Sequence, residues 1–302
     1  MTTNSPVTNR YDFVLLFEVT DGNPNGDPDA GNMPRVDPET MRGFVTDVSL
    51  KRKVRDFVEI MKGNRPPYRI YVQHQSRGGT FLNALHDQAH DSLTPPTPAN
   101  KRKAPPADVK EQARQWMCDN FYDVRAFGAV MTTGSNAGQV RGPLQLTFAR
   151  SIDPISPTEV TITRVAKTTE TRAEMEGTTE MGRKYMIPYG LYLAHGFVSP
   201  SFAAQTGFSE DDLAVFWQAL LRMFEDERSA TRGFMATRAL IVFKHDSPLG
   251  NAPAHELFDR VQVSRKQGIE VARQYADYTV NVLSDVPAGV TILQPKPEYA
   301  AV

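Results

Sequence analysis

The chain has 302 residues, enough for one large domain or two small ones, and its 40% hydrophobic and 23% charged residues are typical of a folded globular protein. The formal net charge of −1 argues against a protein that coats nucleic acid by bulk attraction, so any nucleic-acid site must be a local patch balanced by acid elsewhere. The single cysteine, Cys118, excludes an internal disulfide and a cysteine-based zinc site, which fits a reducing cytoplasm.

The N-terminal region predicts a buried strand followed by turns. The first residues carry no apolar signal region, and no apolar run approaches the ~20 residues that span a bilayer, so we expect a cytoplasmic protein without membrane contact. Residues 11–20 (YDFVLLFEVT) are rich in β-forming residues and predict a buried strand. Residues 21–32 combine Asn, Gly, Asp and Pro at a density that predicts turns. Their aspartates lack the spacing of a calcium loop, which favours a structural turn or a partner contact over a metal site.

A helix with an unusual charge distribution is predicted over residues 45–63. Thr46 or Asp47 can cap its start and Gly63 can end it. An apolar stripe at helical spacing is formed by Val48, Val54, Phe57, Val58 and Met61. The first turns carry four cations, which oppose the helix dipole: Lys51, Arg52, Lys53 and Arg55. We expect all four cations to contact RNA. Lys51 and Arg55 are four residues apart and can grip successive phosphates beside the preceding loop, although a solvated basic surface is the alternative.

Residues 64–121 predict an insertion. Residues 68–72 can form a short strand, and residues 108–121 a helix. Between them lies a Pro-rich basic segment with Lys101, Arg102 and Lys103, which cannot form a helix or a central strand.

Two histidines in this insertion could bind a metal. His86 and His90 are four residues apart and have carboxylates beside them, an arrangement that would suit a nuclease. No third ligand is evident, so we favour a polar exposed segment and predict neither a metal nor a cofactor. The chain also lacks a phosphate-binding GxxxxGK[ST] loop, a GxSxG elbow and an HExxH motif, so we predict no catalytic residues.

The remainder of the chain completes an α+β pattern. Residues 142–152, 189–198 and 239–243 predict strands, and residues 209–227 predict a helix capped by Ser209. Residues 156–187 predict a protruding hairpin. It offers the cations Arg164, Lys167, Arg183 and Lys184. It also offers Met175 and Met181, whose apolar side chains can wedge between bases. The order strand, helix, strand, strand, helix, strand is the βαββαβ, ferredoxin-like arrangement that RRM modules share. We therefore expect a single RRM-like domain over residues 1–302, carrying the insertion and the hairpin.

Several segments together resemble a known family. The run RYDFVLLFEVTDGNPNGDPDAGNMPRVDPET and the following VTDVSLKRKVRDFV are similar to the N-terminal signature of the backbone subunits of type I-C CRISPR Cascade complexes. Further matches are DVRAFGAVM (123–131), GPLQLTFARSIDPI (142–155) and GLYLAHGFVSP (190–200). The resemblance covers nearly the whole chain.

The resemblance implies a non-catalytic protein of the prokaryotic cytoplasm that binds a guide RNA (crRNA). Its RRM-like palm would hold the RNA, while residues 64–121 would form fingers and residues 156–187 a thumb. Copies would stack in a helical filament, and each thumb would kink the guide, leaving segments free to pair with a target DNA strand. The implied partners also include a large subunit and a 5′-end-processing subunit.

The resemblance also implies roles for individual residues. Lys51 and Arg55 would hold the guide backbone, with Thr46 at the helix start and Asn25 and Gly26 in the adjoining loop. Met175 or Met181 would be the wedge at the thumb, and Lys101, Arg102 and Lys103 would touch target DNA or a neighbour. Two alternatives stay open. One is an RNA-processing endonuclease on the same fold that uses His86 and His90 or an acidic residue of the palm. The other is a generic RRM-like binder, which the absence of an aromatic RRM strand motif disfavours.

Overall fold

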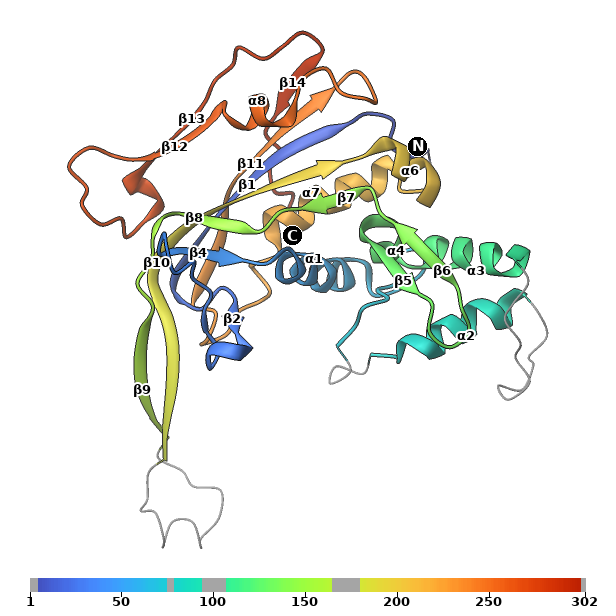
Figure 1. Ribbon diagram of the computed structural model, residues 1–302, viewed down its shortest axis with the longest axis horizontal. Coiled ribbons are helices and arrows are strands. Elements are labelled where there is room, and N and C mark those ends of the chain that lie inside the picture. The colour runs from blue at the N-terminus through green and yellow to red at the C-terminus, as the bar shows by residue number, and fades with distance from the viewer. Residues whose placement is uncertain (1–4, 75–78, 94–106, 165–179, 300–302) are drawn as a thin grey trace, which may run out of the picture.

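In a computed structural model, the chain forms a mixed α+β molecule built on one large antiparallel sheet (Figure 1). The structure describes residues 5–74, 79–93, 107–164 and 180–299. The pairing order of the sheet is β14-β11-β1-β10-β8-β4, and β7 and β9 also pair with β10. These strands are β1 (Tyr11–Gly22), β4 (Arg42–Val45), β7 (Leu144–Leu146), β8 (Ala149–Pro154), β9 (Thr158–Arg164), β10 (Glu180–Val198), β11 (Phe234–His245) and β14 (Val290–Leu293).

Shorter elements surround the sheet. Three two-stranded ladders are formed by β2 (Gly26–Asp27) with β3 (Met33–Pro34), β5 (Gly128–Met131) with β6 (Gly138–Arg141), and β12 (Val261–Arg265) with β13 (Tyr278–Val282). The α-helices are α1 (Asp47–Lys62), α2 (Leu82–Leu93), α3 (Ala107–Asn120), α4 (Tyr122–Phe127), α6 (Pro200–Thr206), α7 (Glu210–Arg222) and α8 (Ala254–Phe258). Within the described residues, no helix is long and apolar enough to span a bilayer.

Strand β1 is covered on both faces, which explains its continuous apolar sequence. Phe13, Leu15 and Phe17 belong to the main core, together with the apolar faces of α1 and α7. Val14 points to the other face and packs with Ile241 under the C-terminal segment that carries α8 and β12. Because successive side chains of a strand alternate between faces, both faces of the predicted strand are buried.

Helices α1 and α7 begin at their predicted capping residues, and α1 also ends at the predicted Gly63, whereas α7 ends at Arg222, before the expected residue 227. The hydroxyl of Thr46 accepts a hydrogen bond from the backbone N–H of Ser49 (3.3 Å), and Gly63 ends α1 in the left-handed conformation. Ser209 and Asp212 form a capping box at the start of α7. The predicted apolar stripe of α1 needs correction, because Val48 is 66% and Met61 36% exposed. Leu50, Val54, Phe57 and Val58 form the buried face instead.

Three predicted elements differ from the structure. The strand expected over residues 142–152 is divided into β7 and β8 by a kink at Thr147 and Phe148. The strand expected over residues 68–72 is reduced to an isolated bridge between Arg69 and Phe121. The strand expected over residues 189–198 is the second half of a much longer one, β10.

A second compact unit lies beside the sheet (Figure 1). Its core is formed by side chains of α2 and α3 with Tyr71, Phe121 and Met131. Val140 of β6 also belongs to this core, so the unit continues past residue 121, where the insertion was expected to end.

The predicted hairpin is formed by β9 and the first residues of β10. Their register runs from Thr158 paired with Met186 to Arg164 paired with Glu180. Figure 1 shows this hairpin projecting away from the sheet, on the same side as the second unit and with α1 between them.

Candidate nucleic-acid interface

The loop after β1 is locked to the start of α1. The side-chain oxygen of Asn25 accepts hydrogen bonds from the backbone N–H and the hydroxyl of Thr46, each at 3.0 Å. Gly26 lies so close to Asn32 that a Cβ at position 26 would stand 1.9 Å from the Asn32 side-chain oxygen. Asn25, Gly26 and Thr46 therefore shape the junction between this loop and the start of α1, called the α1 junction below, through contacts within the protein.

Lys51 and Arg55 share a face of α1, as their spacing predicts. Both cations lie over the ring of Phe127, with Lys51 Nζ 5.7 Å and Arg55 Cζ 5.3 Å from its centroid. Their side chains are only 15% and 11% exposed, and each has a carboxylate partner. Lys51 Nζ lies 2.9 Å from Asp47, and Arg55 Nε lies 2.7 Å from Asp123. Asp47 is 24% exposed but Asp123 only 1%, so Arg55 is held by a buried acid and Lys51 by a partly exposed one.

The other two cations of the helix differ sharply. The Arg52 side chain is 55% exposed, 4.0 Å from Asp56. Lys53 is 2% exposed and forms an ion pair with Glu227, and burial lowers the pKa of its amine to about 8. The prediction that Lys53 contacts RNA therefore needs correction, because its amine is inside the protein.

Helix α4 joins the second unit to α1 and α7 through two buried ion pairs. Asp123, 1% exposed, binds Arg55 and also accepts hydrogen bonds from the backbone N–H groups of Tyr71 (2.7 Å) and Val72 (3.1 Å). Arg125 donates to both carboxylate oxygens of Asp212 in α7, at 2.8 and 2.6 Å. Sequence reasoning missed this anchor. Its only signal was two opposite charges inside the apolar run YDVRAF.

The hairpin residues divide between the described and the undescribed parts of the chain. The Arg183 side chain is 74% exposed and lies 3.1 Å from Glu159 on the facing strand, and Lys184 is half-buried. Arg164 and Met181 lie in the paired strands. Lys167 and Met175 lie outside the described residues, and so do Lys101, Arg102 and Lys103 of the insertion.

The two histidines do not lie in an exposed polar segment, which corrects that expectation. His86 is fully buried in α2, and its ring nitrogens contact the Tyr71 hydroxyl (2.8 Å) and the Thr133 carbonyl (2.9 Å). His90 is 8% exposed and contacts the Asn136 carbonyl at 3.1 Å. These bonds tie α2 to the loop between β5 and β6. In the part of the chain that the structure describes, no group of three or more His, Cys, Asp and Glu side chains is placed to hold a metal.

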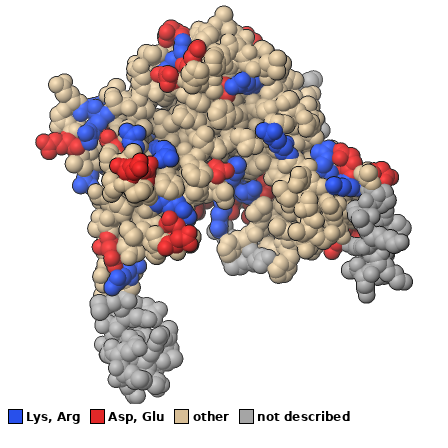
Figure 2. Space-filling model, in the orientation of Figure 1, with Lys and Arg blue, Asp and Glu red and all other residues tan. Residues whose placement is uncertain are grey.

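Charges on the visible face are mixed in sign. Figure 2 shows lysines and arginines distributed over this face with acidic residues beside many of them, in keeping with the net charge of −1. The described residues on this face therefore form no broad basic field that would attract a nucleic acid.

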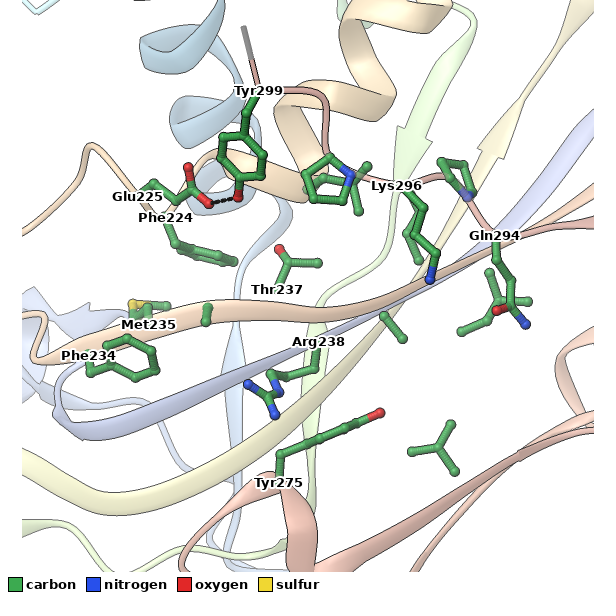
Figure 3. Close-up of a pocket in the computed structure, with 18 of the residues that line it drawn as sticks. Phe224, Glu225, Phe234, Met235, Thr237, Arg238, Tyr275, Gln294, Lys296 and Tyr299 are labelled. Carbon is green, nitrogen blue, oxygen red and sulfur yellow. Dashed lines mark hydrogen bonds between the residues drawn. The ribbon is translucent and has the colours of Figure 1, made fainter. Parts of the chain in front are cut away.

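A cavity of about 520 Å³ lies elsewhere, along β11 and the C-terminal tail. In Figure 3, Thr237 and Arg238 point to opposite sides of β11, and Arg238 lies over the Tyr275 ring, 4.4 Å from its centroid. The tail closes the cavity where the Tyr299 hydroxyl donates to Glu225 (2.6 Å). The described residues that line this cavity include no residue that the sequence predicts to contact RNA.

Comparisons with known proteins give a consistent result. A family model described as CRISPR-associated protein Cas7 matches residues 9–283. A "CRISPR-associated protein Cas7" of Haloferax volcanii is 27% identical over 240 residues, covering 70% of this chain and 64% of the relative, so the match spans less than two thirds of that relative's length.

Two solved structures are also similar. A chain of a pre-nicking CRISPR RNA-guided surveillance complex is 15% identical, with a TM-score of 0.48 and coverage of 78% of both chains. A chain of a second CRISPR RNA-guided surveillance complex is 17% identical, with a TM-score of 0.46 and coverage of 78% of this chain and 68% of that one.

Proposed function

This chain belongs to the Cas7 family of CRISPR-associated proteins, and we propose that it is the crRNA-binding backbone subunit of a type I-C Cascade surveillance complex. Copies of the chain would line one guide RNA, together with a large subunit and a 5′-end-processing subunit. The guide would pair with a target DNA strand in the prokaryotic cytoplasm. One observation carries the proposal beyond the family match: α1 lies between the projecting hairpin and the second unit (Figure 1).

The palm is proposed to be RRM-like. Strands β11, β1, β10 and β8 lie side by side in the order that βαββαβ folds use, and α1 and α7 pack on one face through the main core. An RRM binds RNA on its other face, but here the C-terminal segment covers that face over β1 and β11. We therefore place the guide backbone along the α1 junction, beside Asn25, Gly26, Thr46, Lys51 and Arg52, and not across the middle of the sheet.

Arg55 has a different proposed role. Its bond to the buried Asp123 holds α1 against α4, so that it positions the junction instead of gripping the guide directly. The hairpin remains the proposed thumb, with Arg164, Lys167, Arg183 and Lys184 at the RNA and Met175 or Met181 as its wedge. The second unit remains the proposed fingers, with Lys101, Arg102 and Lys103 at target DNA.

We propose no chemistry for this subunit. His86 and His90, on which the endonuclease alternative relied, are buried and hydrogen-bonded to Tyr71 or to backbone carbonyls. Burial also raises the pKa of the Cys118 thiol to about 11, so that little of the reactive thiolate exists at neutral pH. Both observations support structural roles for these three side chains.

The double variant Lys51→Gln/Arg52→Gln tests the site. Removing two phosphate contacts should weaken binding of an unstructured single-stranded RNA by roughly tenfold or more and lower the slope of log affinity against log salt by about 0.7 per contact. Fluorescence anisotropy at several salt concentrations measures both quantities. Arg55 stays unchanged, because its replacement would leave Asp123 buried without its cation.

A matched control removes two exposed cations from the C-terminal segment, in Lys266→Gln/Arg273→Gln. The control should bind RNA like the wild type. Equal affinity and equal slope for both double variants would disprove the placement of the guide at the α1 junction. A gel of the RNA after incubation separates the endonuclease alternative, which requires cleaved RNA.

A further inference from the structure

Two phenylalanines form a parallel pair at the edge of the large sheet. Phe44 lies in β4 and Phe148 in the kink between β7 and β8. Their ring centroids are 6.1 Å apart and their planes differ by 2°. Phe44 is half-buried, whereas Phe148 is 47% exposed. The exposed ring of Phe148 is therefore supported by the half-buried ring of Phe44.

The pair lies on the sheet face that points away from the helices. Val45 and Ala149 pair across β4 and β8, and both are buried in the core formed with α1 and α7. Because side chains alternate along a strand, Phe44 and its cross-strand partner Arg150 point to the opposite face. The C-terminal segment covers that face over Val14 and leaves Phe148 exposed.

The backbone that carries the pair is held firmly. The Thr147 N–H donates to the His195 carbonyl (2.9 Å), and the His195 N–H donates back to the Thr147 hydroxyl (3.1 Å). The Phe44 N–H donates to the Arg35 carbonyl (3.0 Å), and Arg35 lies in the chain segment that follows the Asn25 loop. Because this backbone is already ordered, stacking of a ligand on the ring would cost only the entropy of the side-chain torsions.

A cation accompanies the rings. The Arg150 side chain is 56% exposed and lies 3.3 Å from Asp37. An exposed aromatic ring with a guanidinium nearby matches a nucleotide, whose base can stack on the ring while its phosphate meets the cation. A surface for protein docking is usually a larger continuous apolar patch, so the chemistry here favours a nucleotide.

We propose that Phe148, backed by Phe44, is a stacking platform for one base of a single-stranded RNA, with Arg150 beside it at the phosphate. This inference rests on the proposed function, because it requires that the chain binds RNA. Phe44 is two residues from Thr46, the N-cap of α1, so the platform continues the proposed path of the guide around the sheet edge. Stacking accepts any base, as a subunit that holds any guide requires.

The test compares Phe148→Ala with Phe148→Tyr, which keeps the ring. By anisotropy with an unstructured single-stranded RNA, Phe148→Ala should bind about tenfold more weakly, while Phe148→Tyr should stay within about twofold of the wild type. The salt slope should not change in either variant, because no phosphate contact is lost. An RNA that carries 2-aminopurine should show fluorescence quenching when it binds the wild type, and Phe148→Ala should reduce this quenching.

Phe81→Ala is the control, because Phe81 is 67% exposed in the second unit and should leave RNA affinity unchanged. Equal affinity of Phe148→Ala and Phe81→Ala, with quenching preserved, would overturn the platform alone. So would a changed mass of RNA-free protein in Phe148→Ala, which would assign the ring to a contact between copies. If the wild type binds no RNA, the proposed function fails as well.

Discussion

Replacing Asp212 by alanine should destabilise the protein by about 3–5 kcal/mol, the usual cost of leaving one partner of a buried ion pair alone. The Arg125 and Asp212 side chains are 5% and 4% exposed and are joined by two hydrogen bonds. Asp212 also accepts the Ser209 N–H (3.0 Å) in the capping box of α7. Without the carboxylate, the Arg125 guanidinium would remain buried and the capping box would lose the bond that Asp212 accepts, while the Ser209 hydroxyl would still cap the helix. Equilibrium unfolding in urea measures the free energy.

Asp211→Ala is the matched control. Asp211 lies in the same first turn of α7, so its removal also takes a negative charge from the helix N-terminus, which costs about 0.3–1 kcal/mol. The two variants differ in the buried ion pair and in the hydrogen bond that the Asp212 carboxylate accepts from the Ser209 N–H. A free energy of unfolding for Asp212→Ala within 1 kcal/mol of that of Asp211→Ala would contradict the anchoring role of α4.

Raising the pH from 7 to 9.5 should stabilise the wild type by about 2 kcal/mol relative to Lys53→Met. The folded protein lowers the pKa of Lys53 from 10.5 to about 8, mainly through burial. Between these values the unfolded chain holds a proton that the folded protein has released, so the free energy of unfolding rises with pH. The contribution is complete above the unfolded pKa and is lost as the pH falls through about 8.

The comparison with Lys53→Met isolates this contribution. Burial raises the pKa of Cys118 to about 11 and that of Tyr71 to about 12, and these groups act in the opposite direction at high pH. Both proteins contain them, so they cancel in the difference. In the variant, Glu227 keeps Arg232 as an ion partner at 3.4 Å. A difference in stability that is the same at both pH values would show that Lys53 titrates normally and is therefore not buried.

Local signals predicted the parts of the fold that depend on neighbouring residues. Thr46 and Gly63 define the two ends of α1, and Ser209 defines the start of α7, through contacts within one helical turn, which a sequence pattern records. The prediction of a strand over residues 68–72 was wrong because the contacts of this segment are distant in the sequence. The backbone N–H groups of Tyr71 and Val72 bind Asp123, about fifty residues further along the chain, instead of a neighbouring strand.

The same limit applies to the candidate site. The sequence shows four cations near the start of α1 but not the acids that meet them in the fold. Glu227 pairs with Lys53 across 174 residues, and Asp123 pairs with Arg55 across 68. The sequence alone therefore does not distinguish Lys53 and Arg55, which have buried or distant acidic partners, from the exposed Arg52. Phe148 was missed because an aromatic residue within an apolar strand pattern is expected to be buried, and the kink that exposes it was not predicted.

The central claim is that copies of this chain assemble along one RNA without cutting it. The most direct test is the mass of the purified protein by light scattering, with and without a single-stranded RNA long enough for several copies, followed by a gel of the RNA. The proposed function predicts large assemblies that form only with RNA and release it intact. A protein whose mass does not change with RNA, or that leaves the RNA cleaved, would contradict it.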